Sequence, residues 1–266
     1  MSKIVSLTKA AALVRDGDRI AIGGNTLHRA PCALLHELVR QGRRNLTLVK
    51  TAGSYDLDLL CATGSARAVE AGYVGYENVL GLARGYRRSV ESGQVEAHEH
   101  SCYTVIAALR AAAQGVPFMP IASLEGSDLI AARGFQRIAN PYGEGVVVTI
   151  PALSPDVALI HVHEADTEGD GAIFGARFED ALMASAARKV ILTCERIVDE
   201  QLLAERPDRA TIPRFEVDAV VELPHGAWPL ACPGEYSYDL DFLTAFAAIA
   251  SDADAVAGFL AERLRW

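Results

Sequence analysis

The sequence predicts an α/β fold with an open, mostly parallel sheet and helices on both sides. A strand pattern at Arg19–Ile22 ends in a diglycine and is followed by a helix pattern at Pro31–Gln41. Two later runs, Val157–Val162 and Lys189–Thr193, are apolar enough to be strands covered on both faces, as parallel strands usually are. Ala176–Ala187 lies between these two runs and supplies the crossover helix that a parallel connection needs.

The remaining segments continue the alternation of helix and strand. Ser6 is placed to cap a helix at Lys9–Val14, before the first strand. The other predicted elements are, in order, a strand at Leu46–Lys50, a helix at Glu77–Ser92, a strand at Val95–Glu99, a helix at Ser101–Ala113, strands at Val146–Ile150 and Val217–Glu222, and two helices after Tyr238 that separate near Ser251 and Asp252. No linker is long and polar enough to divide the chain, so we predict one domain over residues 1–266.

One region lacks sustained periodicity. Phe118–Tyr142 contains glycines and prolines without a repeating apolar pattern, and we interpret it as a long irregular loop. Loops of this length within a compact domain usually serve a functional site. We therefore expect this segment to lie near one.

The composition restricts the function classes. With a formal net charge of −9, the chain is a poor partner for nucleic acids or anionic membranes, which reward clustered Lys and Arg. The compact basic cluster Arg84, Arg87 and Arg88 fits either a solvated helix face or a contact for coenzyme A phosphates. There is no signal-peptide pattern, no apolar run of membrane-spanning length and no Cys-x-x-Cys pair among five cysteines. We therefore expect a cytoplasmic protein without nucleic-acid or membrane partners.

The segment from Asp16 to Pro31 places a turn, a buried strand and Gly23-Gly24 in direct succession. A diglycine at the end of such a strand lets a ligand approach the backbone, at the sheet edge where open α/β folds bind ligands. The segment resembles the signature of the alpha subunit of family I coenzyme A transferases. Asn25 stands where that signature has phenylalanine, and Arg29 replaces its third glycine, as in the glutaconate transferase branch.

The resemblance extends over most of the chain. The segments that carry it are Glu96–Ser101, Gly115–Phe118, Glu125–Asp128, Ala165–Gly171, Ala184–Glu195, Val217–Val221 and Pro224–Pro229. It implies a fold of the NagB/RpiA/CoA transferase type. It also implies transfer of coenzyme A from an acyl-CoA to a carboxylic acid, with an oxo- or unsaturated dicarboxylate such as 3-oxoadipate or glutaconate favoured by Arg29 and by Glu99-His100-Ser101.

In that family the nucleophile is a glutamate on the beta subunit, which forms a glutamyl-CoA thioester. This chain shows no matching glutamate context, so the resemblance implies a beta-subunit partner, in a heterodimer or heterotetramer, and no catalytic nucleophile here. It implies no permanently bound cofactor, with coenzyme A or acyl-CoA as substrate. The site residues we expect to bind substrate or an oxyanion are Gly23, Gly24, Asn25, Arg29, Glu99 and Ser101.

Each of these residues also has a plainer interpretation. Arg29 would either pair with a substrate carboxylate or face solvent, Glu99 would be exposed or salt-bridged, and Ser101 would be a helix N-cap. Cys102 behind His98 and His100 can be written as a nucleophile with a base, but a helical cysteine is more often a buried small hydrophobe.

Other sites and functions fit the sequence less well. His161 and His163 share a strand face without a third ligand in the pattern, so we predict no metal site. No Gly-x-Gly-x-x-Gly follows a strand, which disfavours a Rossmann dehydrogenase. Two alternatives to the transferase are a hydrolase that cleaves a carbon–carbon or thioester bond of a coenzyme A conjugate, and a non-catalytic acyl-CoA-binding protein.

Overall fold

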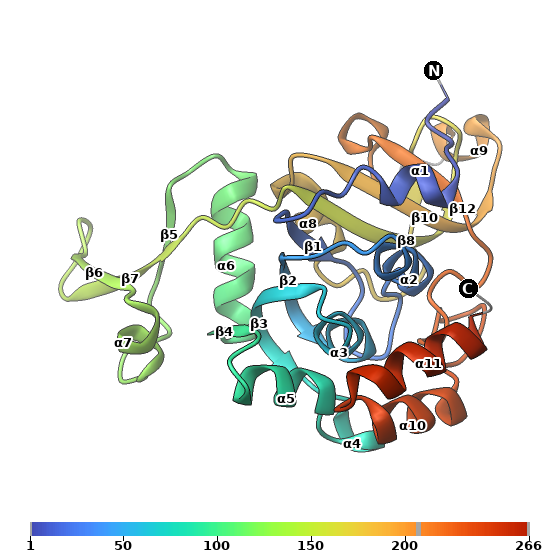
Figure 1. Cartoon of the computed structure of the whole chain (residues 1–266). Helices are drawn as coiled ribbons and strands as arrows, with labels where there is room; N and C mark the ends of the chain where they lie inside the picture. The colour runs from blue at the N-terminus through green and yellow to red at the C-terminus, as the bar shows by residue number, and fades with distance from the viewer. Residues whose placement is uncertain (1, 206–208, 265–266) are drawn as a thin grey trace.

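The computed structural model describes residues 2–205 and 209–264. Within these residues the main sheet has nine strands, and its parallel strands run in the order β12-β10-β8-β1-β2-β3-β4 (Figure 1). Their bounds are β1 (Arg19–Ile22), β2 (Leu46–Gly53), β3 (Ala66–Val74), β4 (Glu96–Glu99), β8 (Val157–Ala165), β10 (Val190–Ile197) and β12 (Ala219–Glu222). Short β9 (Gly171–Ala172) and β11 (Ala210–Ile212) add antiparallel pairs beside the end of β8. The predicted mostly parallel α/β fold is confirmed.

Helices cover both faces of this sheet. The helices of the main body are α1 (Leu7–Ala11), α2 (Cys32–Arg40), α3 (Tyr55–Ala62), α4 (Glu77–Leu80), α5 (Arg84–Glu91), α6 (Cys102–Ala113), α8 (Asp180–Ala186), α9 (Glu200–Ala204), α10 (Leu240–Ile249) and α11 (Ala253–Arg263), with a 3₁₀ turn at Arg214–Glu216. Strand β1 shows why two layers are needed. Ile20 and Ile22 point into the core beneath α1, α2, α3, α10 and α11, whereas Ala21 points into a second core beneath α6 and α8.

A small lobe projects from this body beyond α6 (Figure 1). It contains β5 (Phe118–Ile121), α7 (Leu129–Arg133), β6 (Gln136–Ala139) and β7 (Val146–Pro151), with the strands paired antiparallel in the order β5-β7-β6. The prediction of an irregular loop over Phe118–Tyr142 is therefore wrong. Its strands are too short to show a period, and the sheet forms only through pairing with β7, which follows them in sequence.

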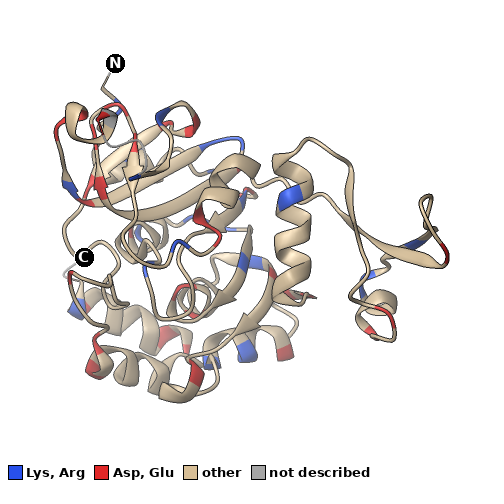
Figure 2. Cartoon of the chain, turned by 180° about the vertical axis from the view of Figure 1, so that it is seen from behind, with Lys and Arg blue, Asp and Glu red and all other residues tan. Residues whose placement is uncertain are grey.

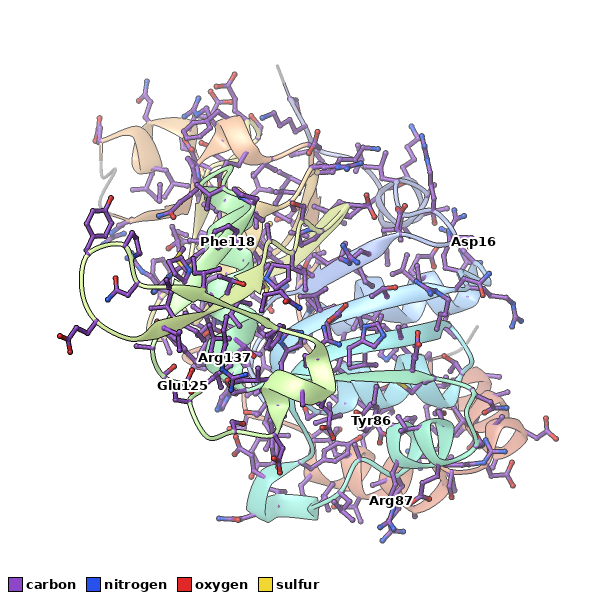
Figure 3. The ribbon with its side chains drawn as sticks, turned by 90° about the vertical axis from the view of Figure 1, so that its left-hand side faces the viewer. Asp16, Tyr86, Arg87, Phe118, Glu125 and Arg137 are labelled. Carbon is purple, nitrogen blue, oxygen red and sulfur yellow. The ribbon has the colours of Figure 1, made fainter. Side chains whose placement is uncertain are left out.

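The lobe is joined to the body through packing as well as through the chain. Ile121, Val148 and Ile150 line the inner face of its sheet and belong to the same buried cluster as Val105 of α6. On the outside of the lobe, Glu125 and Arg137 form an exposed ion pair with Nε and Oε1 3.3 Å apart (Figure 3).

Two other predictions differ from the structure between β2 and β4. The expected helix Glu77–Ser92 is two helices, because Gly81 has a φ of 72° and ends α4. Helix α3 and strand β3 were not predicted. All eight residues of α3 are buried, so it has no polar face to mark a helical period.

Positions of Lys and Arg are interspersed with positions of Asp and Glu along the ribbon in Figure 2. Among the described residues, no helix combines the length and apolar character needed to cross a membrane.

His36 of α2 gives the fold a testable dependence on pH. It is fully buried beside Tyr55, with Nε2 2.7 Å from the hydroxyl, and burial lowers its pKa from 6.5 to about 3. Because the unfolded chain takes up the proton first, folding stability is complete above pH 6.5 and decreases as the pH falls toward 3. We expect His36→Gln to remove about 1.4 kcal/mol per pH unit of this decrease. Urea unfolding at pH 7, 6 and 5 measures the free energy of unfolding of both proteins. If this free energy falls with pH equally in the variant and the wild type, the role of His36 is contradicted.

Candidate active site

The site predicted from Gly23 and Gly24 lies at the point in the sheet where the order of the strands reverses. From β1 the parallel sheet grows one way through β2, β3 and β4, and the other way through β8, β10 and β12. In open α/β sheets, ligands bind outside the carboxyl ends of the strands at such a point. The turn Gly23-Gly24-Asn25, which follows β1, occupies this position.

Both glycines of the turn are required by close packing. A Cβ on Gly23 would lie 2.3 Å from Oδ1 of Asp180, the first residue of α8. A Cβ on Gly24 would lie 2.1 Å from the carbonyl oxygen of His28, and Gly24 also has a φ of 72°. Replacement of either glycine therefore displaces the turn.

Two buried ion pairs hold the turn from opposite sides. Asp180 accepts a hydrogen bond from the N–H of Gly24 at 2.8 Å through Oδ1, and Oδ2 lies 2.8 Å from Nη2 of Arg29. On the other side, Nζ of Lys50 donates to the carbonyl oxygen of Gly23 at 2.7 Å and pairs with Oδ2 of Asp56 at 2.5 Å. All four charged side chains are buried, so each charge depends on its partner.

The predicted backbone donors are occupied within the chain. The N–H of Gly23 donates to Leu159 and that of Gly24 to Asp180, while the N–H of Asn25 donates to the carbonyl oxygen of His28. These N–H groups are therefore not free in this structure, and binding of a substrate or an oxyanion at Gly23 and Gly24 stays a prediction. The side-chain amide of Asn25 is half-buried, and it has no hydrogen-bond partner among the described residues. It is thus the polar group that this turn offers to a ligand.

The structure contradicts one of the two sequence interpretations of Arg29. It is fully buried, so the solvent-facing alternative is wrong, and its guanidinium also donates to the carbonyl oxygens of His161 at 3.1 Å and Ala176 at 2.8 Å. Its φ of 54° is unusual for a residue with a side chain. These contacts assign Arg29 a structural task in the turn, and its binding of a substrate carboxylate stays a prediction.

The other predicted residues lie at the end of β4 and just after it, and β2 and β3 separate β4 from β1. Glu99 is exposed at the end of β4. Ser101 is the N-cap of α6, as its plainer interpretation predicted, and it forms a capping box with Thr104. Its helix starts against β3, since a Cβ on Gly72 would lie only 2.3 Å from the N atom of Cys102.

Cys102 is exposed, which corrects the expectation of a buried hydrophobe. Its thiol donates to the carbonyl oxygen of Thr51 at 3.4 Å. Partial burial and the charge of Glu179 both raise the pKa of this thiol. A raised pKa keeps the thiol protonated, which disfavours Cys102 as a nucleophile.

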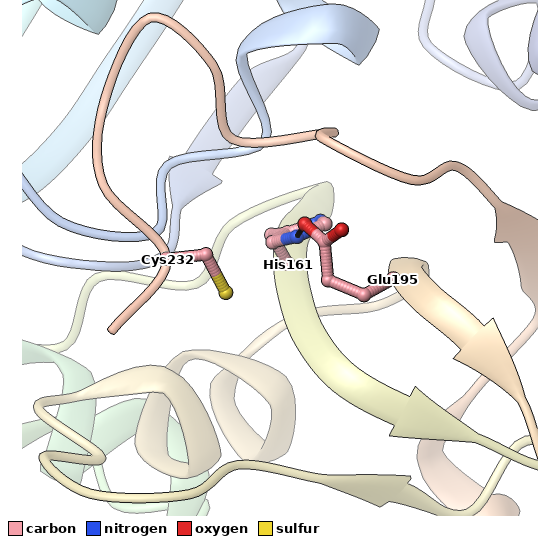
Figure 4. Close-up of side chains that lie close together, drawn as sticks. All are labelled: His161, Glu195 and Cys232. Carbon is pink, nitrogen blue, oxygen red and sulfur yellow. Dashed lines mark hydrogen bonds and ion pairs between the residues drawn. The ribbon is translucent and has the colours of Figure 1, made fainter. Parts of the chain in front are cut away.

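Sequence reasoning missed the buried network around His161. Its Nε2 lies 2.7 Å from Oε1 of Glu195 and its Nδ1 2.8 Å from Oγ1 of Thr193, with Cys232 close by (Figure 4). Glu195 also accepts from the hydroxyl of Tyr236 at 2.6 Å. Burial alone would raise the pKa of Glu195, but these hydrogen bonds outweigh it and lower the pKa to about 2.

The three side chains in Figure 4 are of types that bind metals, although the sequence suggested His163 as the companion of His161. In this structure both ring nitrogens of His161 already face hydrogen-bond partners. We assign the network a structural role beneath the turn, because Gly226 packs against the His161 ring, where a Cβ would lie 2.7 Å from Cε1.

The basic cluster lies on α5, away from the diglycine turn. Arg84, Arg87 and Arg88 are exposed, and Arg87 is directed outward in Figure 3 and pairs with Glu91 at 2.7 Å. A contact with coenzyme A phosphates stays a prediction for this cluster.

Known proteins share this fold and much of this sequence. The family model for coenzyme A transferase matches residues 4–223. The chain belongs to the coenzyme A transferase family. It is therefore an enzyme chain of a family that uses coenzyme A as a substrate.

Several relatives of this coenzyme A transferase chain are similar over nearly its whole length. A glutaconate CoA-transferase subunit from Acidaminococcus fermentans is 34% identical, over 98% of this chain and 88% of the relative. The crystal structure of that enzyme matches with a TM-score of 0.93 at 33% identity, over 98% of this chain and 88% of the solved one. A 3-oxoadipate CoA-transferase subunit from Pseudomonas knackmussii is 32% identical, over 100% of this chain and 94% of the relative. The IpdA subunit of the cholesterol ring-cleaving hydrolase from Mycobacterium tuberculosis is 33% identical, over 94% and 88%.

The ion pair between Arg29 and Asp180 predicts a large loss of stability when one partner is removed. Asp180→Ala leaves a buried guanidinium without its counter-charge, so we expect the free energy of unfolding to fall by about 3–5 kcal/mol. Glu91→Ala breaks the exposed pair with Arg87 and should cost no more than about 0.5 kcal/mol. Urea unfolding of the two variants measures the difference, and equal losses would contradict the buried pair's role.

Proposed function

We propose that the chain is the alpha subunit of a heteromeric coenzyme A transferase, and that it acts with a beta subunit in a heterodimer or heterotetramer. The enzyme would move coenzyme A from an acyl-CoA to an oxo- or unsaturated dicarboxylate such as 3-oxoadipate or glutaconate. The similarity to glutaconate and 3-oxoadipate transferase subunits over almost the whole chain is the observation that carries this proposal.

The proposed chemistry has two transfers through a glutamate of the partner. Its carboxylate attacks the thioester carbonyl, which forms an acyl-glutamyl anhydride and releases the coenzyme A thiolate. The thiolate then attacks the glutamyl carbonyl, so a glutamyl-CoA thioester forms and the first acid leaves. The acceptor acid repeats these steps in reverse. Each addition places negative charge on an oxygen, and one well-placed donor there contributes about 3 kcal/mol.

The contacts suggest how this chain's residues would divide the work. Gly23, Gly24 and Arg29 would shape the turn, because the N–H groups of both glycines and the Nη1 and Nη2 groups of Arg29 already form hydrogen bonds. The free amide of Asn25 would donate to the developing oxyanion, as its half-buried place beside the turn allows. We propose that Glu99 and Ser101 contact the substrate from the end of β4, which lies at the same carboxyl edge of the parallel sheet although β2 and β3 separate it from β1.

Three broader proposals accompany this function. No permanently bound cofactor would be needed, because coenzyme A is itself a substrate. A cytoplasmic location is supported by the five cysteines, which the structure places without disulfides. Residues 1–266 would form one domain, since the second buried core joins the projecting lobe to the sheet.

A trapping experiment on the assembled enzyme tests the transfer mechanism. The chain is co-expressed with its beta partner and treated with hydroxylamine or borohydride during turnover with acyl-CoA and a dicarboxylate. We expect a modified glutamate on the partner and none on this chain. Hydrolysis without such a modification would favour the coenzyme A conjugate hydrolase. A lone chain that binds acyl-CoA at micromolar affinity, without a partner, would favour the binding protein.

The role of Asn25 has its own test in the same complex. Asn25→Ala should lower kcat by about 100-fold or more, as loss of one oxyanion donor does, with little change in KM. Gln94→Ala removes an exposed amide just before β4, at the opposite edge of the sheet, and should leave kcat within twofold. Steady-state kinetics measure both variants, and equal kcat values would remove Asn25 from the proposed site.

A further inference from the structure

A further buried carboxylate lies in β3, at the side of the sheet that faces the lobe. Glu70 is 5% exposed and binds three side chains from different segments. Its Oε1 lies 2.9 Å from Nδ1 of His98, and its Oε2 lies 2.9 Å from Nε2 of His100 and 2.8 Å from Nη2 of Arg133. Burial alone would raise the pKa of Glu70, but hydrogen bonds from both histidines and the charge of Arg133 lower it to about 2. The carboxylate is therefore ionised wherever the protein is folded at ordinary pH.

His100 connects this carboxylate to the start of α6. Its Nδ1 lies 2.9 Å from Oγ1 of Thr104, and the same Oγ1 accepts a hydrogen bond from the N–H of Ser101 at 3.0 Å. The N–H of Thr104 donates in return to Oγ of Ser101 at 3.1 Å. One continuous series of contacts thus runs from Glu70 through His100 and Thr104 to Ser101.

Arg133 connects the same carboxylate to the lobe. It is the last residue of α7, and its guanidinium lies over the ring of Phe135 with 5.9 Å from Cζ to the ring centroid. Phe135 in turn packs against the ring of His100, with 6.1 Å between the centroids. The lobe therefore touches the carboxylate and its histidine partner together.

We propose that Glu70 and His100 are positioning residues for coenzyme A transfer, which fix the first turn of α6 and tie it to the projecting lobe. This inference rests on the proposed function only where it concerns catalysis. Ser101, which we propose contacts the substrate, is the partly exposed end of this series, while Glu70 and His100 are buried. Displacement of a reacting group by about 1 Å can cost 100-fold in rate, so such residues influence kcat without touching the substrate.

His98 supplies a matched control. It binds the same carboxylate as His100, but its ring is 30% exposed, and its Nε2 lies 3.3 Å from exposed Glu96. Among the described residues, the side-chain partners of its ring nitrogens are these two glutamates of β3 and β4, and neither belongs to α6 or the lobe. Loss of His98 therefore removes one hydrogen bond of Glu70 and leaves the series to Ser101 intact.

The experiment compares Glu70→Gln, His100→Asn and His98→Gln in the complex with the beta partner. We expect Glu70→Gln and His100→Asn to lower kcat and kcat/KM together by about 10- to 100-fold, whereas His98→Gln stays within twofold. A purely structural role would reduce the yield of folded enzyme and leave kcat per active site unchanged. If Glu70→Gln does not fold, His100→Asn decides in its place.

A second measurement separates this inference from the proposed activity. Hydrogen exchange is measured on this chain alone, at the amides of Thr104 and Val105, which donate to Ser101. We expect exchange to become at least tenfold faster in Glu70→Gln and His100→Asn and to stay unchanged in His98→Gln. Unchanged exchange in all three variants would overturn the inference. Faster exchange in an enzyme without transferase activity would retain the coupling and reject the proposed function.

Discussion

The geometry of the site depends on the way in which two buried ion pairs hold one turn. Lys50 binds the carbonyl oxygen of Gly23, and Asp180 binds the N–H of Gly24, so both sides of the peptide between the glycines are held by charged groups. Buried pairs of this kind add little net stability, because desolvation offsets most of their attraction. Their value here is geometric. Asp56 and Arg29 neutralise the two charges, and the turn has one position relative to β2 and α8.

This arrangement changes what the diglycine motif does. A glycine pair after a strand usually suggests free N–H groups for an anion, but here a carboxylate of the protein already occupies that place. Asn25 follows the end of β1 and Ser101 follows the end of β4, so both lie at the carboxyl edge of the parallel sheet. The glycines thus permit close packing against Asp180 and His28.

Features that depend only on residues close together in the chain could be predicted from the sequence. The long apolar runs of β8 and β10 and the N-cap at Ser101 depend on neighbouring residues, and all three were predicted correctly. Burial of Arg29 could not be predicted, because Asp180 lies 151 residues away and pairs with it only through the order of the strands. Glu70 was missed for the same reason, since its partners come from β4, the start of α6 and α7. A carboxylate within the apolar run 68–71 was the one available signal.

The central place of β1 also affects the order in which the molecule assembles. Its neighbour β2 follows it closely in the sequence, but its other neighbour, β8, is far away. The N–H of Arg19 donates to Asp156, just before β8, which is 137 residues further along the chain. Contacts between distant segments form slowly, because a long loop must close first. During synthesis β1 is therefore an open edge strand until β8 and α8 emerge, and such edges promote aggregation. The turn acquires Asp180 at that late stage, so the catalytic edge is completed only after most of the chain has been made.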